Sequence, residues 1–95
     1  MDITRTGNGF IQLLEHDIVD TIEYDRYDKT FTVLYKDKTS FKLKSNGSIY
    51  DYSTPVSEDG QVLYVADWEV GMTAYTISTG KVLWKLFLTL VTVIF

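Results

Sequence analysis

The chain has 95 residues, no cysteine, and 13 acidic against 9 basic side chains, which gives a formal net charge of −4. The length fits one small domain, and the charge balance lacks the basic surface that nucleic-acid phosphates require, so we expect no nucleic-acid partner. The absence of cysteine excludes disulfides, thiol nucleophiles and thiolate metal sites.

The composition favours β-structure. Apolar residues make up 45% of the chain and aromatic residues 15%. Aromatic and β-branched side chains favour the pleated, half-buried surface of a sheet. We therefore predict one small all-β domain.

The sequence before Phe10 predicts little regular structure. Residues 1–9 are expected to be a loose leader, because a Gly-Asn-Gly sequence within them favours turns and offers no side chain to bury. No apolar segment typical of a secretory signal is visible there, so a cytoplasmic location is the default expectation. From Phe10 the apolar spacing fits a one- or two-turn helix or a strand, and alternation predicts a strand over Ile18–Tyr24.

Turn-forming residues separate the later strands. Alternating apolar and polar residues at Thr30–Tyr35 and Thr39–Lys44 predict a hairpin with one apolar and one wet face. Asn46-Gly47 predicts a turn, and a short strand is expected at Ser48–Tyr52. Three further strands are predicted at Val62–Ala66, Met72–Ser78 and Val82–Leu86, with a loop at 67–71 and a tight turn at Thr79-Gly80.

The C-terminal run from Leu86 to Phe95 is strongly apolar. A helix needs about 20 residues to cross a bilayer, so this run is about half the required length and no membrane span is expected. We interpret residues 87–95 as an apolar strand that is covered on both faces.

An imperfect internal repeat relates the two halves of the chain. Asp28–Leu34 aligns with Asp59–Val65, and Asn46–Ile49 aligns with Thr79–Val82 after a two-residue adjustment near Trp68. A repeat of about 30 to 45 residues with about four short strands is typical of one propeller blade. The sequence therefore predicts a weak blade-like repeat over 18–52 and a better one over 53–86.

The second repeat resembles a blade of the quinoprotein (PQQ-like) eight-bladed β-propellers. Their tryptophan-docking motif is Ala-x-Asp-x-x-x-Gly-Lys-x-x-Trp; Ala74, Gly80, Lys81 and Trp84 match it, and Thr76 replaces its aspartate. The stretch before this motif is also similar to the YVTN-type propeller repeat. The resemblance implies an antiparallel meander of about two propeller-like blades; a small antiparallel β-sandwich or barrel is the alternative fold.

The motif residues have physical roles that suit blade packing. Alanine is small where strands crowd, glycine takes a turn conformation that side chains disfavour, and tryptophan supplies a large apolar plate between blades. A Trp84 buried in this way would cost about 3 to 5 kcal/mol on truncation to alanine.

The resemblance does not extend to a cofactor. Quinone-binding members assemble their site from residues around a complete ring, which two blades do not supply, so we expect no cofactor and no metal. The single histidine, His16, is expected to be solvated or hydrogen-bonded, since no second histidine or cysteine accompanies it. The acidic series from Asp17 to Asp28 lacks the glycine-centred loop and terminal glutamate of a calcium site.

One loop is a candidate interaction site. Asp67, Trp68 and Glu69 combine acidic side chains with an aromatic one where the two repeats differ in length. No catalytic motif is present, so the leading hypothesis is a non-enzymatic interaction module that self-associates through apolar edges. The alternative is a fragment of a larger quinoprotein-like propeller enzyme.

Overall fold

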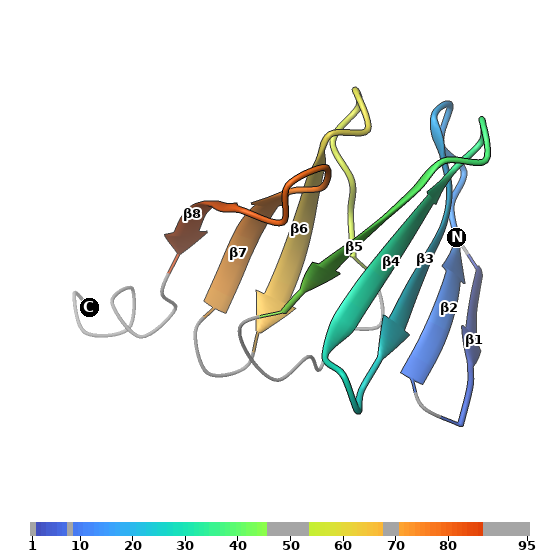
Figure 1. Cartoon of the computed structure of the whole chain (residues 1–95), viewed down its shortest axis with the longest axis horizontal. Helices are drawn as coiled ribbons and strands as arrows, with labels where there is room; N and C mark the ends of the chain where they lie inside the picture. Colours follow the sequence, from blue (N-terminus) through green and yellow to red (C-terminus); the bar gives the residue numbers. More distant parts are fainter. Residues whose placement is uncertain (1, 8, 46–53, 68–70, 87–95) are drawn as a thin grey trace.

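The computed structural model describes residues 2–7, 9–45, 54–67 and 71–86 (Figure 1). Within these residues the chain forms two antiparallel sheets and no helix, which confirms the predicted all-β antiparallel fold. The strands are β1 (Asp2–Arg5), β2 (Gly9–Leu13), β3 (Val19–Asp25), β4 (Thr30–Tyr35), β5 (Ser40–Lys44), β6 (Val62–Asp67), β7 (Gly71–Thr76) and β8 (Val82–Leu86).

The first five strands form one sheet in their sequence order, β1-β2-β3-β4-β5. Its register aligns Phe10, Tyr24, Phe31 and Leu43 in one row across four strands. All four side chains are buried, and the Tyr24 ring lies 5.6 Å from Phe10 and 4.6 Å from Phe31 between centroids. The aligned row gives this sheet one apolar face, as the period-2 pattern of the β4–β5 hairpin predicts.

The last three strands form a second sheet in the order β6-β7-β8. A short segment lies along the outer edge of β6: Val56 makes an isolated bridge to Leu63, and the Tyr64 amide donates to the Pro55 carbonyl at 3.0 Å. This segment satisfies backbone groups at an edge that would otherwise be open.

The two sheets share one core (Figure 1). Leu63, Val65 and Tyr75 from the small sheet are buried in the same cluster as the apolar row of the large sheet. The two sheets are not closed into a barrel, and the arrangement is that of a small β-sandwich, in which inner-face side chains interdigitate.

Polar contacts fix the segment that leads from one sheet to the other. Gln12 and Thr54 are both fully buried; the Thr54 amide donates to Gln12 Oε1 at 3.0 Å, and Gln12 Nε2 donates to the Thr54 carbonyl at 3.2 Å. The Tyr35 hydroxyl donates to the Gly60 carbonyl at 2.6 Å. Because buried polar groups are costly when unpaired, these bonds hold Thr54 and Gly60 in place against the large sheet.

Most predicted strands are confirmed, with bounds that differ by at most two residues at either end. The expected loose leader over 1–9 is wrong, because Asp2–Arg5 forms β1 on the edge of the large sheet. Gly9 is a strand residue as well: a Cβ added there would lie 1.8 Å from the Tyr24 carbonyl oxygen, so glycine permits a close approach of β2 to β3.

The ambiguous segment after Phe10 is a strand rather than a helix. Its backbone hydrogen bonds pair it with β1 and β3 in a three-stranded meander. This pairing outweighs the helical spacing that includes two adjacent leucines. The predicted turn at Asn46-Gly47, the strand at Ser48–Tyr52 and the C-terminal strand at 87–95 lie outside the described residues.

Candidate functional site

The residues of the docking motif lie on the hairpin formed by β7 and β8. Ala74 is in the middle of the central strand β7, and Trp84 on β8 is its direct cross-strand partner. Gly80 and Lys81 lie in the connection between these strands. The structure therefore brings Ala74 and Trp84 together and places the other two residues at the turn.

Ala74 lies beneath two aromatic rings. Its direct partners in the register are Tyr64 on one side and Trp84 on the other. The two ring centroids are only 6.0 Å apart, although two strand spacings amount to about 9.6 Å, so the rings converge over the strand between them. Ala74 is consequently 0% exposed, and a larger side chain there would separate the rings.

A β-bulge determines the face on which Trp84 lies. Val82 pairs with Tyr75, whereas Trp84 pairs with Ala74, so Leu83 is an extra residue in β8. Without the extra residue, Trp84 would be opposite Thr73, which faces the core and is buried. The bulge thus turns Trp84 to the outer face, as bulges commonly do for a side chain at a sheet edge.

The turn before β8 depends on Gly80. The Gly80 amide donates to the Thr76 carbonyl at 2.7 Å, and the Thr76 amide donates to the Lys81 carbonyl at 2.8 Å. Gly80 has a φ of 72°, and an added Cβ would lie 3.3 Å from the Cβ of Leu43 in the other sheet. Backbone groups of Thr76 therefore close the turn at the position where the related motif has aspartate.

We call Tyr64, Met72, Ala74, Trp84 and Leu86 the apolar outer face of the small sheet. They alternate with core-facing residues along β6 and β7, and the register aligns Trp84 and Leu86 of β8 with them. Trp84 is 46% exposed and Leu86 is 52% exposed. The five residues carry no charge, so this face presents aromatic and aliphatic surface where a solvated sheet would carry polar side chains.

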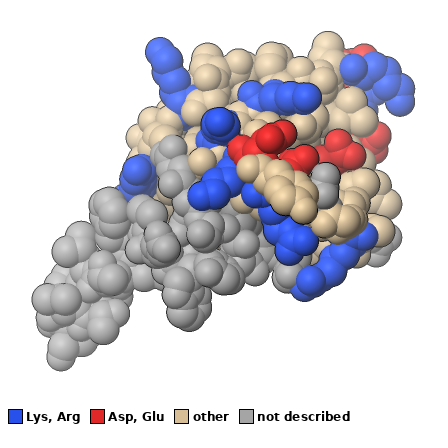
Figure 2. All heavy atoms as spheres, turned by 60° about the horizontal axis from the view of Figure 1, so that its bottom comes forward, with Lys and Arg blue, Asp and Glu red and all other residues tan. Residues whose placement is uncertain are grey.

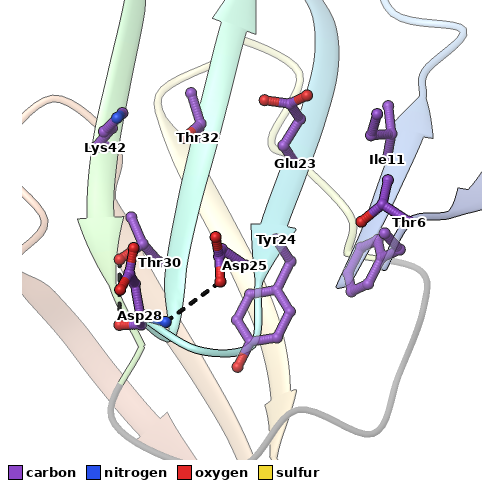
Figure 3. A pocket seen from close by; sticks show the side chains of 10 residues that line it. Thr6, Ile11, Glu23, Tyr24, Asp25, Asp28, Thr30, Thr32 and Lys42 are labelled. Atoms are coloured by element: carbon purple, nitrogen blue, oxygen red, sulfur yellow. Dashed lines mark hydrogen bonds between the residues drawn. The ribbon is translucent and has the colours of Figure 1, made fainter. Parts of the chain in front are cut away.

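The outer face of the large sheet has the opposite character. Figure 3 shows Ile11, Glu23, Thr32 and Lys42 side by side across four strands, and the register aligns the same four residues. They line a shallow hollow of about 290 Å³. We call this surface the polar outer face.

One acidic residue at this hollow, Asp25, stabilises the turn between β3 and β4. The Asp25 Oδ1 atom accepts from the Tyr27 amide at 2.9 Å and from the Asp28 amide at 3.3 Å (Figure 3). No group of three or more acidic or histidine side chains is positioned to hold a metal among the described residues. Figure 2 shows lysine, arginine and acidic side chains interspersed on the end of the molecule that carries this turn.

His16 has a structural role. Its Nδ1 atom accepts from the amides of Ile18 at 3.0 Å and Val19 at 3.1 Å, and its Nε2 atom is 2.9 Å from the Ser57 carbonyl. A neutral ring with the proton on Nε2 satisfies all three bonds. Since both nitrogens tie backbone segments together, the prediction of a hydrogen-bonded histidine is confirmed.

Three ionisable side chains, Tyr35, Asp37 and Asp59, interact electrostatically where the turn after β4 approaches the turn before β6. Burial raises the pKa of Tyr35, and the negative charges of Asp59 and Asp37 raise it further. The pKa of Asp59 is lowered by hydrogen bonds from the Ser57 hydroxyl and the Gln61 amide. The pKa of Asp37 is lowered in the same way by the hydroxyl and amide of Thr39.

The candidate loop after β6 is only partly described. Asp67 ends β6 and pairs with Gly71, and Trp68 and Glu69 lie outside the described residues. The interaction role of this loop stays a prediction. The more extensive feature is the apolar outer face, in which Tyr64 and Met72 join Ala74 and Trp84 of the docking motif.

Comparison with known proteins identifies no relative: no family model, curated protein or solved structure matches the chain. No helix long and apolar enough to span a membrane occurs in the described part of the chain. The site is therefore interpreted from its own geometry.

Proposed function

We propose that the chain is a non-enzymatic structural or protein-interaction module that associates with other copies through its apolar outer face. One observation carries the proposal: Trp84 and Leu86 are about half exposed on a sheet face whose described residues include no charged side chain. Contiguous exposed apolar surface of this kind is typical of interaction sites.

The strand arrangement supports propeller-like blades as the building units. Each sheet is a meander of consecutive antiparallel strands, and the segment at Val56 adds a fourth element beside β6, as a four-stranded blade requires. The pairing of Ala74 with Trp84 also suits the docking motif. In a propeller, the face that carries this tryptophan would be covered by another blade.

The proposal assigns no catalytic residue and no cofactor. His16 uses both ring nitrogens for hydrogen bonds to the backbone. The carboxylates of Asp25, Asp37 and Asp59 each accept bonds within their own turns. These groups stabilise local structure, which is a sufficient role for each of them.

Static light scattering on the purified chain tests the proposal. We expect the weight-average mass to rise above that of a 10.9 kDa monomer as the concentration increases through the micromolar range. A constant monomer mass up to about 500 µM would contradict self-association, since even small interfaces have affinities within that range.

A second candidate function is part of a larger quinoprotein-like propeller enzyme. It is favoured by the small sheet's apolar character on both faces, which is typical of a sheet covered on both sides. A reading frame that continues beyond Phe95 with further Gly-Lys-x-x-Trp repeats would support this alternative. Stoichiometric binding of a quinone or calcium by the isolated chain would contradict both functions.

A further inference from the structure

We propose that the apolar outer face pairs with the same face of a second copy, related to it by a two-fold axis. This inference rests on the proposed self-association and specifies its surface and its symmetry. It predicts a closed dimer in which Met72 and Trp84 of one copy lie against the apolar outer face of the other.

The chemistry of the two outer faces favours like-with-like pairing. Copies that stacked head to tail would place the apolar outer face against the polar outer face, where Glu23 and Lys42 would be buried. Burying such charges without designed partners costs several kcal/mol. Two apolar outer faces meet without burying any charged side chain.

The shape of the face also suits a sheet-on-sheet contact. Trp84 and Tyr64 cover Ala74, while Met72 and Leu86, which are direct cross-strand neighbours, extend the face along the strands. Inner faces of sandwiches pack about 10 Å apart through side chains of this size. The bulge at Leu83 contributes directly, because it gives this face its largest side chain.

The small area of the apolar outer face predicts a weak dimer. Three strands spaced about 4.8 Å apart, each with five or six residues at about 3.3 Å, make a face of roughly 14 by 18 Å, or about 250 Å² in projection. Stable dimers usually bury about 800 Å² per partner. We therefore expect dissociation constants of tens to hundreds of micromolar.

The net charge of −4 on each chain opposes association at low ionic strength. Salt screens this repulsion beyond about 10 Å at 0.1 M, while the contact between apolar surfaces persists. Dimerisation through the apolar outer face should consequently strengthen, rather than weaken, when salt is raised from low to moderate concentration.

Sedimentation velocity at about 5 to 500 µM, the range set by the estimated affinity, tests the inference with matched lysine substitutions. Met72→Lys lies on the central strand of the apolar outer face and should weaken dimerisation at least tenfold. Thr32→Lys introduces the same side chain on the central region of the polar outer face. This variant should change the strength of dimerisation less than twofold. Leu86→Lys replaces a half-exposed residue and provides a second disrupting variant that retains the fold.

Each outcome is informative once circular dichroism has confirmed the folded state of the variants. A wild-type chain that stays monomeric overturns both this inference and the proposed self-association. Association that survives Met72→Lys and Leu86→Lys leaves self-association standing but overturns this surface. Weakening by Thr32→Lys as well, or growth into species larger than dimers, indicates head-to-tail stacking and overturns the two-fold arrangement.

Site-directed cross-linking tests the symmetry directly, because the chain has no cysteine of its own. Met72→Cys chains should join to each other through a thiol reagent that spans about 10 Å, the spacing of stacked sheets. Thr32→Cys chains should not. Efficient cross-linking only in an equimolar mixture of the two variants would contradict like-with-like pairing.

Discussion

The two sheets of this protein differ mainly on their outer faces. Both are antiparallel meanders with short strands, and both contribute one apolar face to the shared core. The large sheet then carries mostly threonine and charged side chains outside, whereas the small sheet carries Tyr64, Met72 and Trp84. The large sheet resembles the outer layer of a sandwich, and the small sheet resembles an inner layer.

The difference between the two outer faces follows from the residues that alternate along the strands. In β4, Thr30 and Thr32 alternate with the buried Phe31 and Val33, so the outward parity is polar except at Leu34. In β6, Leu63 and Val65 face the core, while Tyr64 and Ala66 occupy the other parity. Apolar residues at both parities are typical of sheets covered on both sides, which is the physical basis for proposing a partner for the small sheet.

Truncation of a core aromatic residue should have the largest effect. Phe31→Ala removes a fully buried ring that packs at a tilt against Tyr24, and we expect it to lower the free energy of unfolding by about 3 to 5 kcal/mol. Urea denaturation measures this change. Because the ring lies inside the sandwich, the loss should not depend on protein concentration, and a concentration-dependent loss would contradict its placement.

Truncation of Trp84 should cost less in dilute solution. The ring is 46% exposed and retains one aromatic neighbour, so Trp84→Ala should lower the free energy of unfolding by about 1 to 2 kcal/mol. At concentrations where the chain assembles, the cost should increase. A loss as large as that of Phe31→Ala at low concentration would show that the monomer already covers this face.

Much of the fold follows from local pattern. The strands at Thr30–Tyr35 and Val82–Leu86 match their predicted bounds, because turn residues precede both and alternation marks the first. β1 escaped prediction because its described side chains are exposed and its structure comes from pairing with β2. An edge strand of this kind has no hydrophobic alternation to detect.

The candidate site was predicted in part. The spacing between Ala74 and Trp84 predicts a packing device, and the register makes the two residues cross-strand partners. The contact between Trp84 and Tyr64 depends on the register of a third strand and on the bulge at Leu83, neither of which local periodicity specifies. A single extra residue decides whether the tryptophan points to the core or to solvent.

The Tyr35 hydroxyl connects the large sheet to the turn that precedes the small one. Tyr35→Phe removes its hydrogen bond to the Gly60 carbonyl and should lower the free energy of unfolding by about 1 kcal/mol at pH 7. Denaturant titration of the two proteins measures this difference. An unchanged free energy of unfolding would mean that this contact does not hold the sheets together.

The same variant has a defined pH dependence. The folded protein raises the pKa of Tyr35, so the associated stability is fully present below about pH 10, where unfolded tyrosine ionises, and is lost as the pH rises through the folded pKa. Wild type should therefore lose stability more steeply than Tyr35→Phe above pH 10. The other tyrosines are present in both proteins and cancel in the comparison.

The smallest predicted effect concerns two turns, one beside each sheet. Asp37 follows β4 of the large sheet and Asp59 precedes β6 of the small one, and each has a pKa lowered by a neighbouring hydroxyl and amide. A lowered folded pKa means that the stability from each carboxylate is present above about pH 4 and is lost as the pH falls through the folded value.

Asp37→Asn and Asp59→Asn should each flatten the dependence of unfolding free energy on pH below about pH 4, by a similar amount because the two turns bond their carboxylates alike. Chemical denaturation at pH intervals from neutral to strongly acidic measures both slopes. A much larger change for Asp59→Asn would show that the turn joining the sheets contributes more than a local turn of the large sheet. Unchanged slopes in both variants would contradict the hydrogen-bonded carboxylates.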